Sequence, residues 1–279
     1  MGCNAFRMGI AWSRIQPTTF LEPYPPPKWD SDAVAHYAKI LETLITYKME
    51  PILTLHHFTH PMWLDIDLWL SKKGPQLFIE FATRIVDELN QKLLKRVNRT
   101  LTYFIVFNEP NLFPILLYLI GSHPHQKKGP RSLLKTYDAI FSIYVKIFDQ
   151  LHDLYKNHLW KKPSISYNLF STCIHELDKM SFDLMRLHSN KIDESQIETN
   201  IKAYKRKWYH RVERAAKQRH TKREYENYLK LVSTTAQLLP PFSLKKTIQA
   251  IYDSPQDKKV EYLAMDIYDP FTSIEASPP

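Results

Sequence analysis

Residues 101–110 read LTYFIVFNEP, an apolar run that ends on an amide, a carboxylate and a proline. An unbroken apolar run of this length is typical of a strand buried on both faces, as in a parallel sheet. Pro110 cannot donate to a strand's hydrogen-bond ladder, so the strand ends there and directs Glu109 into the space beyond it. The segment therefore predicts a buried strand with a carboxylate at its C-terminal end.

The rest of the chain repeats this arrangement of short apolar runs and helical patterns. Strand-like runs lie at 5–12, 51–55, 101–107, 164–168 and 260–267, and helical patterns at 31–47, 77–94, 133–155 and 178–250. Asp30 and Ser31 are suited to cap the first of these helices. Strands alternating with helices predict βαβ units and a parallel sheet, while the lack of a Gly-x-Gly-x-x-Gly or Walker loop disfavours a nucleotide-binding sheet.

Polar residues recur where the predicted strands end, at 13–14, 56–57, 108–109 and 168. A (β/α)8 barrel carries its active site at this end of its strands, which favours a barrel. A carboxyl group beside an amide at this position suits glycoside cleavage, because the amide can hold a sugar hydroxyl while the carboxyl protonates the glycosidic oxygen. The Asn-Glu-Pro sequence alone also fits an ordinary surface loop.

Three ordered motifs resemble glycoside hydrolase family 1. They are Phe6-Arg7 with Trp12-Ser13-Arg14-Ile15, the segment PILTLHHF at 51–58, and FNEPN at 107–111. Weaker matches occur at Tyr118, Gly121, His123-Pro124 and 261–270. The resemblance implies an α/β fold, an incomplete TIM (β/α)8 barrel covering roughly strands two to six. The chain 1–279 would be one partial domain, with a helical, basic insertion at 178–255.

The resemblance also implies roles for individual residues in cleaving a β-linked glycoside. Glu109 matches the general acid/base, Asn108 the amide that binds the sugar 2-hydroxyl, and His57 the histidine that contacts the 3-hydroxyl. Trp69 matches a substrate-binding tryptophan, although the two glycines that precede it in the family are missing. Asp266 stands at a substrate-binding position where the family has Asn.

The same resemblance assigns Arg7 and Tyr268 to orienting the nucleophile, a second carboxylate that retaining hydrolysis requires. No Thr-Glu-Asn-Gly-like segment that would carry this nucleophile occurs in the sequence. Glu275 is the only later glutamate, and it follows Asp266 too closely for a crossover helix and another parallel strand. We therefore expect the chain alone to be inactive, with Arg7 and Tyr268 directed at a carboxylate supplied elsewhere. A second chain could supply the missing strands.

Other functions remain open at this stage. A non-catalytic carbohydrate-binding or membrane-associated remnant fits the same residues. So does a galactolipid glycosyltransferase-like branch, because some relatives of the family process galactolipids at plant chloroplast membranes. No cofactor is implied. His56, His57 and His60 lack the helix and the glutamate of a zincin motif, so we expect no metal site.

The net charge of +9 is concentrated in one segment, because residues 202–223 carry ten Lys and Arg against the single acid Glu213. The favoured interpretation is an amphipathic helix over the barrel, with Tyr204 and Trp208 facing inward. The second interpretation is a weak contact with an anionic membrane. The third is nucleic-acid binding, which only the positive charge supports. Two cysteines and the absence of a signal-peptide pattern predict a cytoplasmic protein.

Overall fold

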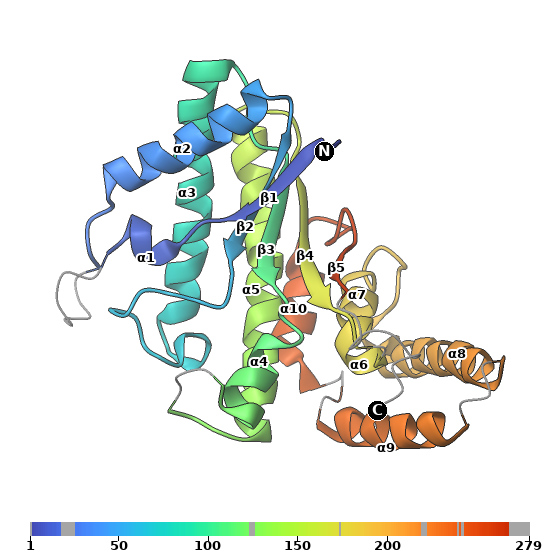
Figure 1. Cartoon of the computed structure of the whole chain (residues 1–279). Coiled ribbons are helices and arrows are strands. Elements are labelled where there is room, and N and C mark those ends of the chain that lie inside the picture. The colour runs from blue at the N-terminus through green and yellow to red at the C-terminus, as the bar shows by residue number, and fades with distance from the viewer. Residues whose placement is uncertain are drawn as a thin grey trace.

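The computed structural model describes residues 2–17, 26–122, 126–172, 174–218, 222–238, 240 and 243–267. Over these residues, five parallel strands form one sheet in the order β1-β2-β3-β4-β5 (Figure 1). The strands are β1 (Ala5–Gly9), β2 (Glu50–His56), β3 (Tyr103–Asn108), β4 (Ser164–Phe170) and β5 (Ala264–Asp266). Sheet order follows chain order, as expected of successive βα units.

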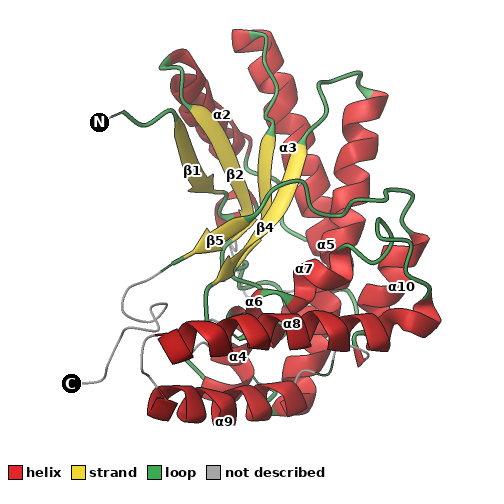
Figure 2. Cartoon of the chain, turned by 90° about the vertical axis from the view of Figure 1, so that its right-hand side faces the viewer, coloured by secondary structure: helices red, strands yellow, loops and turns green. Residues whose placement is uncertain are grey.

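Helices that connect the strands pack on one face of this sheet (Figures 1 and 2). They are α1 (Trp12–Ile15), α2 (Ser31–Thr46), α3 (Gly74–Val97), α5 (Pro130–Asn157) and α10 (Lys245–Asp253). Short elements lie in the loops: η1 (Leu68–Leu70), α4 (Phe113–Ile115), η2 (Leu116–Ile120), α6 (His175–Asp178), α7 (Met180–Met185) and η3 (Glu194–Gln196). Asp30 caps α2 as predicted, its side chain accepting from the backbone N–H groups of Asp32 and Ala33.

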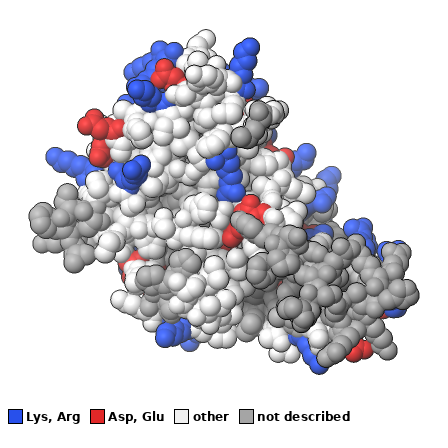
Figure 3. Space-filling model, viewed as in Figure 1, with Lys and Arg blue, Asp and Glu red and all other residues white. Residues whose placement is uncertain are grey.

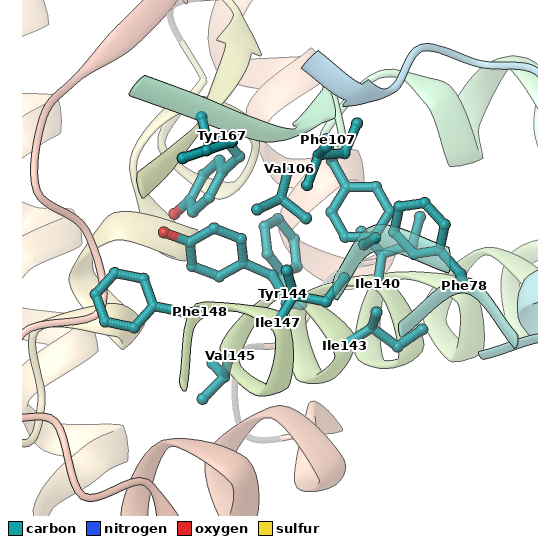
Figure 4. Packing of buried hydrophobic residues seen from close by; sticks show 14 of the residues in the cluster. Phe78, Val106, Phe107, Ile140, Ile143, Tyr144, Val145, Ile147, Phe148 and Tyr167 are labelled. Carbon is teal, nitrogen blue, oxygen red and sulfur yellow. The ribbon is translucent and has the colours of Figure 1, made fainter. Parts of the chain in front are cut away.

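The hydrophobic core lies between the sheet and these helices. Figure 4 shows Val106 and Phe107 of β3 facing Ile140 and Tyr144 of α5, with Phe78 of α3 beside them. All five side chains are at most 1% exposed. Burying apolar surface contributes roughly 25 cal/mol per Å², so this layer is the main source of stability for the sheet that positions the site.

Two predicted strands are shorter than the sequence suggested. The run at 5–12 leaves the sheet after Gly9, and Trp12 begins α1, where its ring stacks on Phe81 with centroids 4.7 Å apart. In the run at 260–267, only 264–266 form a strand. Just before that strand, the Glu261 carboxylate accepts a hydrogen bond from the Ile165 backbone N–H. A side chain therefore binds a backbone group of β4 that a longer β5 would bind through its own backbone.

The basic segment forms α8 (Ile197–Gln218), which lies beside α9 (Lys222–Leu238) at the end of the sheet toward which β4 points (Figure 2). Buried Glu176 of α6 binds two residues of α8. It forms an ion pair with Lys205 and accepts a 2.7 Å hydrogen bond from the Tyr209 hydroxyl. Tyr204 packs against the core, and half-buried Trp208 lies with its ring 6.4 Å from that of buried His175, so both side chains face inward as the favoured interpretation predicts. Residues 219–221 of the segment lie outside the described residues.

Surface charge on the described part of the chain is mixed in the view of Figure 3, where Lys and Arg are scattered rather than gathered in one patch. None of the described helices combines the length and the apolar character that crossing a membrane requires.

Candidate active site

The candidate site lies at the C-terminal ends of the strands and is organised around Arg7 of β1. The Arg7 Nε donates to Thr54 Oγ1 of β2 at 2.9 Å. Its Nη2 donates to Asn108 Oδ1 of β3 at 2.5 Å and to Asn168 Oδ1 of β4 at 2.8 Å. Its Nη1 lies 3.5 Å from Asp266 Oδ1 of β5. One guanidinium group therefore contacts a side chain from each of the other strands.

A β-bulge in β3 places Asn108 in this cluster. Ile105 pairs with Ser166 and Asn108 with Asn168, so three steps along β3 correspond to two steps along β4. Side chains alternate between the faces of a strand, and the extra residue shifts that alternation by one. Phe107 consequently points into the helix-covered core, while Asn108 points to the face that carries Arg7.

Glu109 follows the bulge in an uncommon backbone conformation. Its φ is +42°, in the left-handed region that non-glycine residues rarely adopt, and its N–H donates to the Asn168 carbonyl at 2.9 Å. Such strain persists where the surroundings fix it, and it is frequent at active sites. The residue is only 5% exposed.

The environment of Glu109 favours its protonated form. The pKa of its carboxyl is raised to about 7, chiefly by burial and further by the neighbouring Asp266 carboxyl group, while the positive charge of Arg7 acts in the opposite direction. A carboxyl group with a pKa near neutrality can hold a proton and release it during a reaction, which is what a general acid requires. The chemistry that the geometry supports best is proton donation to a bound substrate.

His57 lies at the same end of the sheet and is exposed. Partial burial lowers the pKa of its imidazole, the positive charge of Arg7 lowers it further, and Asp266 acts in the opposite direction. A neutral imidazole both donates and accepts hydrogen bonds, so His57 is suited to contact a hydroxyl group.

Trp69 does not join the cluster around Arg7. It is 3% exposed and packs edge-on against His56 and Phe107, with centroid distances of 4.9 and 5.4 Å. Its Nε1 has no hydrogen-bond partner among the described residues. Tyr268 lies outside the described residues. The structure thus brings together Arg7, Asn108, Glu109 and Asp266, with His57 beside them, and places Trp69 in the core.

One expectation about this cluster changes with the geometry, and one residue that was not predicted joins it. Arg7 was expected to point at a carboxylate supplied by another chain, whereas it already has a carboxylate partner here, Asp266. Asn168 was not among the predicted site residues, yet it accepts from Arg7 and its Nδ2 donates to Asp266 Oδ2. Its place at the end of a strand was the one signal in the sequence.

The histidines after β2 were considered as metal ligands. His56 is buried among aromatic rings, and burial lowers the pKa of its imidazole well below the usual value. Across the described ranges, no three His, Cys, Asp or Glu side chains are grouped in a way that could hold a metal ion.

Replacing Arg7 by Met is expected to lower the free energy of unfolding by about 2 kcal/mol. The part-buried side-chain oxygens of Thr54, Asn108 and Asn168 would each lose a charged hydrogen-bond donor. Urea unfolding followed by circular dichroism measures this change. Lys202→Met is the matched control, since Lys202 and its partner Glu198 are 63% and 53% exposed. The control substitution should lower the free energy of unfolding by at most ~0.5 kcal/mol. Equal losses in the two variants would contradict a structural role for the Arg7 network.

The chain is similar to known proteins in sequence and in fold. The sequence pattern of the family described as Glycosyl hydrolase family 1 matches residues 1–193. The chain belongs to this family. Its sheet is a half-barrel that corresponds to about half of the family's TIM barrel.

Among similar curated proteins is a chloroplast galactolipid galactosyltransferase of Arabidopsis thaliana, 34% identical over 126 residues, or 44% of this chain and 18% of that protein. Another is a 6-phospho-beta-galactosidase of Lacticaseibacillus casei, 30% identical over 46% of this chain and 24% of that protein. A family 1 β-glucosidase structure from Thermotoga maritima superposes with a TM-score of 0.58 at 15% identity, covering 96% of this chain and 50% of the other. The chain thus spans about half of that solved structure.

Proposed function

We propose that this chain is the acid/base half of a retaining β-glycosidase, in which β1 to β5 correspond to barrel strands two to six. The observation that carries the proposal is the position of Glu109, which is buried beside Arg7 and Asn108 and has a pKa of about 7. The nucleophile and the remaining strands would come from a second half-barrel. The structural match supports this division, because it covers about half of the β-glucosidase chain.

In the completed site, Glu109 would protonate the glycosidic oxygen of a β-linked glycoside while the incoming carboxylate attacks the anomeric carbon. Asn108 and His57 are the groups that we assign to the sugar hydroxyls. Glu109 would then return as the base that activates water, because the same group must serve both steps.

The long connection between β4 and β5 is best described as a helical insertion within a single partial domain. It runs from 171 to 263 and contains α6 to α10. Within it, the ion pair between Glu176 and Lys205 joins the basic helix α8 to α6, the first helix after β4. We assign residues 178–255 to this insertion.

The experiment is to assay hydrolysis of an aryl β-glycoside by the chain alone and with a second half-barrel. DNA flanking the gene should be searched for a Thr-Glu-Asn-Gly-like strand, and the polypeptide that carries it should be produced and mixed with this chain. We expect no turnover by the chain alone and turnover with retained anomeric configuration in the mixture. If the chain alone hydrolyses the glycoside and Glu109→Gln abolishes this turnover, the proposal that the nucleophile comes from outside these residues is contradicted. Sugar binding without turnover in every mixture would favour a non-catalytic module.

A galactolipid glycosyltransferase-like branch is the second candidate. It is favoured by the similarity to the Arabidopsis protein and by the basic helix α8, on which Arg206, Lys207, Arg211 and Arg214 are exposed. Such side chains suit weak contact with anionic lipid. In the same mixture, galactolipid vesicles would yield transfer products under this alternative, and free sugar alone under the hydrolase proposal.

A further inference from the structure

β5 forms one edge of the sheet, because among the described residues it pairs only with β4 (Figure 2). The other side of β5 therefore offers its backbone to a further strand, as exposed sheet edges generally do. Leu263, Met265 and Ile267 alternate along this edge and are 77%, 45% and 71% exposed. Asp266 faces Arg7, so these three side chains face the side of the sheet on which the helices pack.

A groove of about 790 Å³ lies between β5 and the helices α7 and α8. Leu263 and Met265 line one wall, and Phe182 of α7 and Trp208 of α8 line the other. Phe182 stacks on Tyr167 of β4 with ring centroids 4.9 Å apart, so that wall is anchored to the hydrophobic core. The groove has room for several side chains of an incoming segment, because pockets of about 300–1,000 Å³ enclose whole small ligands.

The acidic side chains of the groove lie beneath basic ones. Glu261 is 14% exposed and is paired with Lys162, which is 70% exposed. Asp183 is 5% exposed and is paired with Lys179, which is 34% exposed. Asp178, the third acid of the described lining, is 3% exposed. A molecule that enters the groove therefore meets ammonium groups before it meets carboxylates.

Two further cations of the groove, Arg186 and Lys258, are exposed and have no acidic partner among the residues that the structure describes. Arg186 follows α7 and Lys258 precedes β5, so each wall of the groove contributes one of them. Uncompensated charges of one sign favour partners of the opposite sign and exclude partners of the same sign. The uncovered surface is thus apolar inside the groove and positive at its rim.

We propose that β5 and this groove, together the β5 docking surface, receive a strand–helix unit of a second polypeptide. The strand lies parallel to β5 on its free edge, and the helix that connects parallel strands lies in the groove. This helix carries an apolar stripe against Met265 and Phe182, flanked by acidic side chains toward Arg186 and Lys258. The proposal rests on the proposed function, because the second half-barrel invoked there is the polypeptide that would carry this unit.

The test uses two synthetic helical peptides as probes. Each has about 15 residues, with Leu along one face and either Glu or Lys on both sides of that stripe. Binding of each labelled peptide to the whole chain is measured by fluorescence anisotropy. We expect the Glu peptide to bind at least about tenfold more tightly than the Lys peptide. Met265→Asp places a charge in the apolar wall and should weaken binding of the Glu peptide by a similar factor.

Arg186→Glu combined with Lys258→Glu should reverse the preference, so that the Lys peptide becomes the tighter ligand. Lys39→Glu is the matched control, because Lys39 is exposed on α2, which contacts β2 toward the opposite edge of the sheet. The same change of charge there should leave both affinities unchanged. Equal binding of the two peptides, binding of neither, or an equal effect of Lys39→Glu would overturn the proposal. Circular dichroism verifies that each variant folds.

A second copy of this chain is the competing occupant, and size-exclusion chromatography with light scattering tests it. A dimer that Met265→Asp dissociates would assign the surface to self-association and overturn the proposal, whereas a monomer that binds the Glu peptide supports it. None of these measurements depends on turnover. If the peptides bind as expected and no mixture cleaves a glycoside, the β5 docking surface stands and the proposed hydrolase activity fails.

Discussion

Glu109→Gln is expected to lower the kcat of the completed barrel by about 10²–10⁴-fold on a β-glycoside with a poor leaving group. A carboxamide keeps the shape and the hydrogen-bonding capacity of the side chain but cannot release a proton to the glycosidic oxygen. The loss should be much smaller on a dinitrophenyl glycoside, because that leaving group departs without protonation. Steady-state kinetics on the two substrates measure the difference.

Glu80→Gln serves as the control for this substitution, because Glu80 is exposed on α3, where it accepts a hydrogen bond from Gln76 one turn away. It should leave both substrates unaffected. With a pKa of about 7 for the acid, the rate on the poor leaving group should fall as pH rises through neutrality, where Glu109 loses its proton. Equal losses of kcat on both substrates would contradict the acid role.

Phe107→Ala is expected to lower the free energy of unfolding by about 3–5 kcal/mol. Phe107 is 1% exposed, and its ring centroid lies 5.2 Å from that of Phe78 and 5.4 Å from that of Trp69. Truncation leaves a cavity that these rigid rings cannot fill. Chemical denaturation of the whole chain measures the change.

Phe6→Ala is the matched control, because Phe6 of β1 is 49% exposed. The same deletion there removes little buried surface and should cost less than about 1.5 kcal/mol. If the two variants were equally stable, the ring cluster beneath the site would not be a close-packed core.

Much of the sheet could be predicted from the sequence, because short runs rich in buried apolar residues alternate with helical patterns. The runs at 51–55, 101–107 and 164–168 lie within β2, β3 and β4 or extend them by two residues at most. The first strand was predicted too long, since Trp12 is as apolar as a strand residue but packs as part of α1. Apolar character alone does not distinguish these two kinds of burial.

The sequence predicted which residues belong to the site better than it predicted the contacts between them. Arg7, Asn108 and Glu109 were named from motifs, and the structure places them together. The contact between Arg7 and Asp266 joins residues on opposite edges of the sheet, and no local pattern encodes which partner a guanidinium group selects. The bulge in β3 was equally hidden, because the stretch FIVF at 104–107 contains no glycine or polar residue to mark it.

That bulge affects how this segment should be aligned and engineered. Deleting Val106 would restore regular pairing with β4, because Ile105 and Asn108 would then be two steps apart, as Ser166 and Asn168 are. Asn108 and the residues after it would keep their faces, and the core would lose one of two adjacent apolar side chains. A one-residue gap placed here in a comparison of homologues is therefore compatible with an unchanged site.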